Sequence, residues 1–308
     1  MMAQKKSNDQ VIMLLEAGEF LEAQAYLSRM LTEDLNDPHV SDGLKITAFW
    51  LARLEEMDGM AGEVERADYF YAQWFRFTAF VGRQSSFVFE RGYNSVKKWV
   101  FRTVLETYKR HKAQFKHSDS SFYLRTGRCY KFLGRYDDAL KEMEEALRYN
   151  RDSSEIMAEF ADCYGLLNEI DYSKVLFREA FYLGPQGVNL DLIQSGYMVR
   201  LIERVKERSD REEEVKEWIP VYAVLYEVFD VKREMKELEA GRLRQSIYGL
   251  QSELKSPDKE WRTVPRLLYR YFLLIDYYLS SGKEREKIGD ILKRIELLDR
   301  DIFKLYIS

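Results

Sequence analysis

An internal repeat of 34 residues constrains the fold of this chain more than any other feature of its sequence. When the sequence is shifted by 34, residues 120–153 align with residues 154–187 without a gap. Seven positions are then identical, where chance would give about two. The identical pairs are Ser120/Ser154, Cys129/Cys163, Tyr130/Tyr164, Leu133/Leu167, Asp137/Asp171, Glu145/Glu179 and Ala146/Ala180. A period of this length indicates structural units that stack on one another, because one unit alone cannot bury its apolar face.

The spacing of apolar residues predicts helices along the whole chain. Val96, Val100, Val104 and Tyr108 recur at intervals that place them on one face of a helix. The five prolines leave long windows without the strongest helix breaker. No segment shows convincing alternation of apolar and polar residues between turn signals, so we predict no strand. The expected fold is all-α, with short turns that make neighbouring helices antiparallel.

Small residues at paired positions of the repeat predict where two helices approach each other closely. Gly127 and Ala139 in the first unit correspond to Ala161 and Ser173 in the second. A residue without a long side chain lets two helix backbones come near, while larger residues around it fill the remaining space. We therefore expect each unit to be a tightly packed helix hairpin.

The repeated segment resembles the tetratricopeptide repeat family, whose pattern is W-x2-L-G-x2-Y…A-x3-F…P. The first unit reads Tyr123-x2-Thr126-Gly127-x2-Tyr130…Ala139-x3-Met143, and the second reads Met157-x2-Phe160-Ala161-x2-Tyr164…Ser173-x3-Phe177…Pro185. No Trp opens either unit, and Arg151 replaces the Pro at the end of the first. The resemblance implies a right-handed superhelical solenoid of antiparallel helix pairs.

The remainder of the chain carries only fainter traces of the pattern. Residues 120–187 contain the two clear repeats, whereas residues 1–117 and 188–308 are expected to form degenerate helix pairs. One trace is the turn at Gly18, which echoes the turn at Gly134. Since stacked irregular pairs account for all of these segments, we predict a single helical-repeat domain over residues 1–308, irregular at both ends.

Charge and hydropathy exclude several classes of protein. The chain has 48 Lys and Arg against 52 Asp and Glu, a net charge of -4, whereas a dedicated nucleic-acid binder needs a basic surplus. The most apolar stretch, Val264 to Leu279, is interrupted by Arg266, Arg270 and Asp276, so it reads as a buried helix and not as a membrane span. Two cysteines without an export signal are most simply reduced thiols, which predicts a cytoplasmic protein without a membrane or nucleic-acid partner.

Few residues offer catalytic or metal-binding chemistry. The three histidines are His39, His111 and His117, and the last two are too far apart on a helix to share a metal as an i, i+4 pair would. Nucleophile-elbow, metalloprotease, dinucleotide and phosphate-loop motifs are absent from the sequence. We therefore predict a protein that is not an enzyme and holds neither metal nor cofactor. The repeated Cys129 and Cys163 are interpreted as small core thiols, with a redox pair as the alternative.

The resemblance also implies a place for a partner. In the resembling family the first helix of each unit lines a concave groove, and the exposed residues of these helices select the partner. The implied groove residues are Arg125, Arg128, Lys131, Glu155, Glu159 and Asp162. A basic row beside an acidic row suits a mixed-charge partner segment, or it is a charged face that pairs with itself, and the sequence leaves both interpretations open.

An apolar segment near the C-terminus has two interpretations. Residues 269–274 are apolar on more than one helix face. Either these residues belong to the core, or Tyr269, Tyr271 and Phe272 form a patch for self-association.

The function predicted from the sequence is a non-catalytic protein–protein interaction scaffold or adaptor. It would bind a peptide segment or helix of a protein partner in its concave groove, with a homo-oligomer as an open option. The alternative is a regulatory subunit of an enzyme or of a secretion or assembly complex. An RNA-binding helical repeat is a third hypothesis, which the net charge and the acidic groove residues disfavour.

Overall fold

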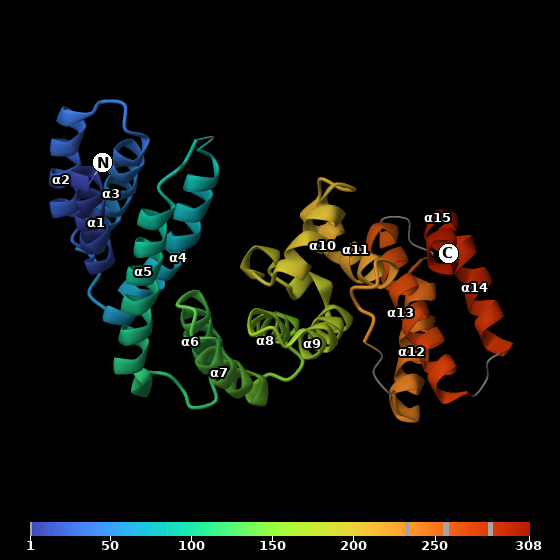
Figure 1. Cartoon of the computed structure of the whole chain (residues 1–308). Coiled ribbons are helices and arrows are strands. Elements are labelled where there is room, and N and C mark those ends of the chain that lie inside the picture. Colours follow the sequence, from blue (N-terminus) through green and yellow to red (C-terminus); the bar gives the residue numbers. More distant parts are fainter. Residues whose placement is uncertain (1, 85, 232–234, 255–258, 283–285) are drawn as a thin grey trace. The chain divides into compact units, whose positions relative to one another are not determined.

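The computed structural model describes residues 2–84, 86–231, 235–254, 259–282 and 286–308. Within these ranges the chain consists of α-helices and three short 3-10 helices, and no β-strand is present (Figure 1). The predicted all-α fold is confirmed for this part of the chain. The chain divides into two compact units, residues 1–149 and residues 150–308, so the boundary falls near the end of the first repeat, residues 120–153. A single continuous domain stays a prediction.

Unit 1 contains seven α-helices and one 3-10 helix in its described residues. They are α1 (Met2–Ala17), α2 (Phe20–Glu33), α3 (Pro38–Met57), α4 (Glu63–Gly82), α5 (Glu90–Arg110), η1 (Lys112–Gln114), α6 (Ser120–Phe132) and α7 (Tyr136–Tyr149). Trp50 of α3 is fully buried. Four ring centroids lie within 6.3 Å of its ring centroid, those of Phe20, Phe70, Phe77 and Trp99. Because these rings come from α2, α4 and α5, one aromatic cluster joins four helices.

The two repeats form helix hairpins of equal dimensions. The first is α6–α7, and the second consists of α8 (Ser154–Leu166) and α9 (Ile170–Leu183). Each boundary of the second hairpin lies 34 residues after the matching boundary of the first. Ala139, Ala161 and Ser173 are fully buried, and the Ser173 hydroxyl donates a hydrogen bond to the Ala161 carbonyl at 2.6 Å. The predicted close approach of the paired helices is confirmed in the second hairpin.

The first helices of both hairpins end in the same way, and so does α1. Gly18, Gly134 and Asn168 follow the ends of α1, α6 and α8 with φ of 84°, 74° and 64°, in the left-handed region that Gly and Asn tolerate best. The next amide then donates back to a carbonyl in the last helical turn, as in a Schellman motif. These bonds run from Glu19 to Leu14, from Arg135 to Tyr130 and from Glu169 to Tyr164, each at 2.9 Å. The similarity between the turns at Gly18 and Gly134, noted in the sequence, is therefore a shared backbone geometry.

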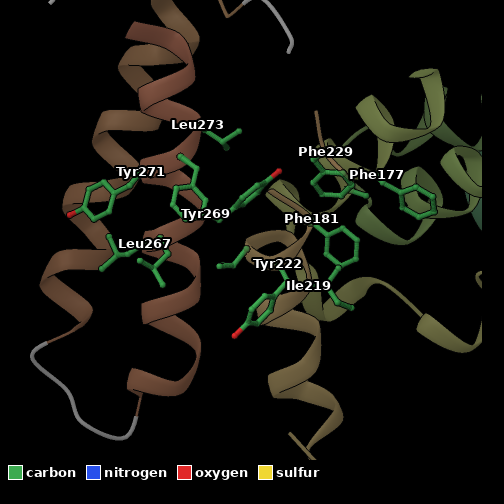
Figure 2. Close-up of a cluster of buried hydrophobic side chains, with 14 of the residues drawn as sticks. Phe177, Phe181, Ile219, Tyr222, Phe229, Leu267, Tyr269, Tyr271 and Leu273 are labelled. Carbon is green, nitrogen blue, oxygen red and sulfur yellow. The ribbon is translucent and has the colours of Figure 1, made fainter. Parts of the chain in front are cut away.

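Unit 2 continues from the second hairpin with six further α-helices and two 3-10 helices in its described residues. They are η2 (Pro185–Gly187), η3 (Leu190–Leu192), α10 (Gly196–Lys206), α11 (Glu212–Leu225), α12 (Glu237–Glu253), α13 (Glu260–Ser281), α14 (Glu286–Leu298) and α15 (Arg300–Ile307). Helix α13 packs against α11, α12 and α14 and carries much of the buried apolar surface of this unit. Figure 2 shows Leu267, Tyr269 and Leu273 of α13 in the core that also receives Phe181 and Ile219.

The most apolar stretch of the sequence, Val264 to Leu279, lies within α13. Its residues at the helix centre are buried, as the sequence predicts for a core helix. Among the described residues, none of the helices combines the length and apolarity needed to cross a membrane.

The three aromatic residues considered for self-association lie in the core of unit 2. Tyr269, Tyr271 and Phe272 are each at most 3% exposed. The Tyr269 hydroxyl donates to the Arg178 carbonyl at 2.9 Å, and the Tyr271 hydroxyl accepts from Gln251 at 2.7 Å. These side chains therefore offer no exposed patch, because helices on three sides of α13 cover them.

Candidate binding site

The basic residues expected to line a groove are engaged within unit 1. Arg125 of α6 is half-buried, and its guanidinium donates to Asp68 of α4 at 2.5 Å. Arg128 and Lys131 are buried, with 7% and 1% of their surface exposed. Arg128 also donates to the Tyr71 hydroxyl of α4 at 3.4 Å. Because these side chains satisfy their charge and polarity inside the protein, they are not the open basic row that the resemblance implied.

The acidic residues of the second repeat are likewise less exposed than the resemblance implied. Glu155 is half-buried, whereas Glu159 and Asp162 are buried. The Asp162 carboxylate accepts from the backbone amides of Gln194 at 3.0 Å and Ser195 at 2.8 Å. It thereby provides hydrogen-bond acceptors for the two backbone amides directly before α10, so its role there is structural. Partner binding by these residues stays a prediction, and the structure corrects the expectation that all of them face solvent.

Unit 2 contains a cavity between α9, α12 and α13, which we call the α9–α13 cavity. Its volume is about 270 Å³. The lining residues are Asp152, Val175, Arg178, Glu179, Tyr182, Leu183, Met235, Glu239, Arg242, Tyr269, Leu273, Asp276 and Tyr277. Aliphatic groups and three tyrosine rings thus form much of the wall, and charged groups surround them.

Arg178 is held in a fixed position at this cavity. Its guanidinium pairs with Asp276 at 2.5 Å and donates to the Val231 carbonyl at 2.9 Å, while its own carbonyl accepts from Tyr269. Burial raises the pKa of the Tyr269 phenol, so the hydroxyl stays protonated and acts as a donor. The cavity wall is therefore preorganised, which reduces the conformational entropy lost when a ligand binds.

The remaining charges give the α9–α13 cavity an acidic character. The pair of Arg178 and Asp276 is neutral as a whole, and the other charged residues of the lining are three carboxylates and one guanidinium. They are Asp152, Glu179, Glu239 and Arg242. Glu239 additionally accepts from the Lys236 amide at the start of α12, and Asp152 is exposed at the rim. Tyrosine rings beside carboxylates favour a cationic or aromatic side chain.

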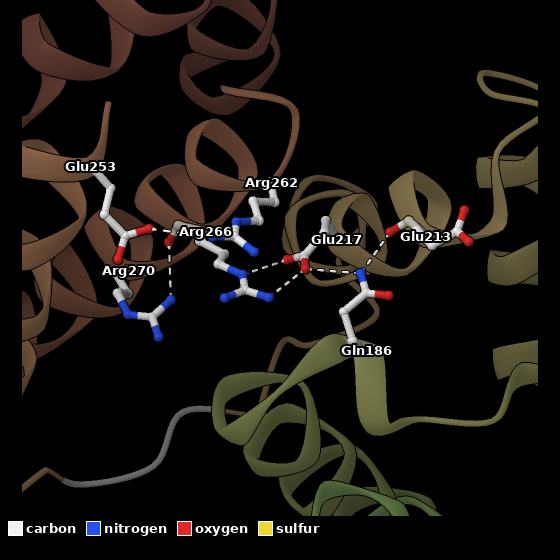
Figure 3. A network of polar contacts seen from close by, with 7 residues as sticks. All are labelled: Gln186, Glu213, Glu217, Glu253, Arg262, Arg266 and Arg270. Atoms are coloured by element: carbon white, nitrogen blue, oxygen red, sulfur yellow. Dashed lines mark hydrogen bonds and ion pairs between the residues drawn. The ribbon is translucent and has the colours of Figure 1, made fainter. Parts of the chain in front are cut away.

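A buried charge network joins α13 to α11. The Glu217 carboxylate of α11 is fully buried and accepts two hydrogen bonds from Arg266, at 2.5 and 2.8 Å, and one from Gln186 at 2.9 Å (Figure 3). One turn further on, Arg270 lies over the Tyr182 ring at 5.2 Å, and burial lowers the pKa of its guanidinium. This stacking fixes one of the three rings that line the α9–α13 cavity.

The histidines and cysteines occupy structural positions. His111 contacts Glu63 at 2.8 Å and His117 contacts the Tyr149 hydroxyl at 3.1 Å, so they face different partners. Cys129 and Cys163 are buried thiols, and burial raises the pKa of Cys129. Across the described ranges, no three His, Cys, Asp or Glu side chains are grouped as metal ligands would be.

Neither a protein-family model nor a curated protein matches this chain. The candidate site therefore rests on the geometry of the cavity. Sequence reasoning did not find it, because Arg178 and Asp276 are far apart in the chain and neither belongs to a motif. The tyrosine-rich stretch around Tyr269 was a signal, although it pointed to the core and not to a cavity beside it.

Proposed function

We propose that this protein is a non-catalytic protein-interaction scaffold whose α9–α13 cavity receives a side chain from a partner's peptide segment. The cavity, at about 270 Å³, is slightly smaller than the roughly 300–1,000 Å³ typical of small-molecule sites. That volume suits one large side chain of a longer segment, whose flanking residues would contact the rim. The observation that carries the proposal is the excess of carboxylates around a preorganised, tyrosine-lined wall. The anchor is therefore a basic side chain, Arg or Lys, beside an apolar residue.

The proposal includes the architecture that the sequence suggested. The two hairpins would be repeats of the tetratricopeptide type that stack in a right-handed superhelix. The equal hairpin boundaries and the shared helix ends at Gly134 and Asn168 support repeated units. A cytoplasmic location and a homo-oligomer are further parts of the proposal, and light scattering on a size-exclusion column tests the second.

Selection of peptides on the intact chain tests the proposed function. A random peptide library displayed on phage would be selected against the full chain, and the enriched peptides measured by fluorescence anisotropy. We expect one class of enriched peptides to share an Arg or Lys next to an aromatic or aliphatic residue. Asp152→Lys places a positive charge at the rim and should weaken binding about tenfold, because it repels the basic anchor.

The matched control is Glu203→Lys, which makes the same charge change on the exposed surface of α10. It should leave the affinity of the selected peptides unchanged. A selection that yields no class of peptides with a basic residue, or equal affinities of that class for wild type and Asp152→Lys, would contradict the proposal. Circular dichroism on each variant separates lost binding from lost folding.

A further inference from the structure

A second cavity lies on the opposite side of the α12–α13 pair, where α14 completes it. Its volume is about 270 Å³. We call it the α12–α14 cavity. Its buried lining residues are Ile247, Tyr271, Leu274, Tyr278 and Ile291. These residues form an apolar floor to which three helices contribute, so the floor is a fixed part of the core of unit 2.

The rim of the α12–α14 cavity is basic. Arg244, Lys287 and Arg294 line it together with a single carboxylate, that of Asp290. Arg294 is exposed and has no ion-pair partner among the residues that the structure describes. Arg244 also contacts Glu237 at 3.4 Å. The excess of positive charge is the opposite of what surrounds the α9–α13 cavity.

An exposed tyrosine adds apolar surface to this basic rim. Tyr248 of α12 lines the cavity and is 70% exposed. A large ring held in solvent beside an apolar floor can cover a side chain that enters the cavity, as aromatic residues do at protein interfaces.

The chemistry of the floor distinguishes between anionic partners. A nucleic acid would need aromatic faces on which bases stack in succession. Of the three tyrosine rings in the lining only that of Tyr248 is exposed, so there is no succession of open rings for bases, and the volume admits one or two side chains. An acidic peptide satisfies both parts of the cavity, because its carboxylates can meet the arginines while an apolar side chain reaches the floor.

We propose that the α12–α14 cavity is a second binding site, which takes an acidic peptide segment through one aromatic or aliphatic anchor. The anchor enters above Ile247 and Ile291, and the flanking carboxylates pair with Arg294. The site shares no lining residue with the α9–α13 cavity. Its test is therefore independent of the proposed function of that cavity.

Three fluorescein-labelled pentapeptides test this site on the full chain by fluorescence anisotropy. The first has Phe between two pairs of Glu, the second has Phe between two pairs of Gln, and the third has Ser between two pairs of Glu. We expect the first peptide to bind about tenfold more tightly than either of the others, because only it supplies both the anchor and the charge. Its affinity should fall as salt is added.

Two substitutions locate the binding. Arg294→Glu should weaken the first peptide about tenfold by charge reversal, and Ile291→Trp should weaken it by filling the floor without a change of charge. The matched control is Lys293→Glu, the exposed neighbour on α14 that does not line the cavity. It should retain wild-type affinity.

Each contrary result has a definite meaning. Equal affinity for the two Phe peptides, no measurable binding of the first peptide, or equal losses from Arg294→Glu and Lys293→Glu would each overturn the proposal. Tighter binding of a twelve-nucleotide uridine RNA that Arg294→Glu abolishes would overturn it in favour of a nucleic-acid ligand. Peptides selected on the α9–α13 cavity should keep their affinity for Arg294→Glu, so failure of one site is distinguishable from failure of the other.

Discussion

The guanidinium of Arg266 binds both carboxylate oxygens of Glu217, whose side chain has no exposed surface. The pair links α13 to α11, and Gln186 extends the link to η2 through a hydrogen bond to the same carboxylate. A buried carboxylate is tolerated only when such donors replace the water it has lost. This pair therefore determines how α11 and α13 pack in unit 2.

Removal of one partner of this pair should be costly. We expect Arg266→Met to lower the free energy of unfolding by about 3–5 kcal/mol, because the Glu217 carboxyl group would be left buried without its main donor. The double variant Glu217→Leu with Arg266→Met should be more stable than Arg266→Met alone. Urea unfolding followed by circular dichroism measures both. The control is Arg262→Met, since Arg262 and Glu253 form a more exposed pair at 3.9 Å that should contribute less than about 1 kcal/mol. Equal losses for Arg262→Met and Arg266→Met would contradict this account.

A methyl group added at Gly127 should destabilise the first hairpin. A Cβ at this position would lie 2.9 Å from Met143 Cγ and 3.4 Å from the Ala139 carbonyl oxygen. We expect Gly127→Ala to lower the free energy of unfolding by about 1–3 kcal/mol through overpacking. Gly241→Ala is the matched control, because no atom lies within 4 Å of its Cβ, and it should stabilise α12 by about 0.5–1 kcal/mol. Thermal unfolding of both variants gives the comparison, and a stabilised Gly127→Ala would show that the helices are not in close contact.

The contribution of the N-terminal cap of α6 to stability should depend on pH, because the cap is the carboxylate of Asp119. This carboxylate accepts from the Ser121 hydroxyl at 2.6 Å and the Ser121 amide at 2.9 Å, and these bonds lower its pKa. A carboxyl with a pKa lowered by folding stabilises the protein above its unfolded pKa, near 4, and this contribution is lost as the pH falls through the folded value. We expect Asp119→Asn, which keeps the cap without the charge, to be less stable than wild type at pH 7, with a smaller difference between the two proteins at pH 3. Urea unfolding at both pH values checks this, and a constant difference between the two proteins would exclude a role for the titration.

The stability of the last helix, α15, should depend on one stacked pair of aromatic rings. Tyr306 of α15 lies against Phe272 of α13 with centroids 4.3 Å apart and an interplanar angle of 9°. We expect Tyr306→Ala to cost about 2–3 kcal/mol, because it removes this contact and exposes Phe272. Tyr306→Phe keeps the ring and should stay within about 0.5 kcal/mol of wild type. Hydrogen exchange of α15 amides would detect the local loss, and unchanged protection in Tyr306→Ala would show that other contacts hold the helix.

The hairpins could be predicted from the sequence because their determinants are local. Period and turn chemistry act over a few residues, so Gly134 and the residues around it sufficed to place the end of α6. Asn168 reaches the same backbone geometry although it is not a glycine. The small residues Ala161 and Ser173 correctly indicated where two helices of one hairpin meet.

The surfaces could not be predicted in the same way. Helical spacing places Arg128 and Lys131 on one face of α6, and Glu159 and Asp162 on one face of α8. It does not tell whether another part of the chain covers those faces. Asp162 is an example, because the backbone amides that bury it belong to residues about 30 positions later. The aromatic residues of α13 are a second example. The neighbouring side chains of Tyr269, Tyr271 and Phe272 each contact a different partner.

Local periodicity was therefore enough to establish the all-α fold and the 34-residue hairpins, because helix formation and close pairing depend on residues near one another in the sequence. The burial of the charged residues and the two cavities beside α13 were decided only in the tertiary structure. Cavities and buried ion pairs arise where side chains from distant helices meet, as at Arg178 with Asp276 and Glu217 with Arg266. The linings of the two cavities differ in the sign of their charge. Which lining groups are neutralised by such ion pairs depends on how the chain packs.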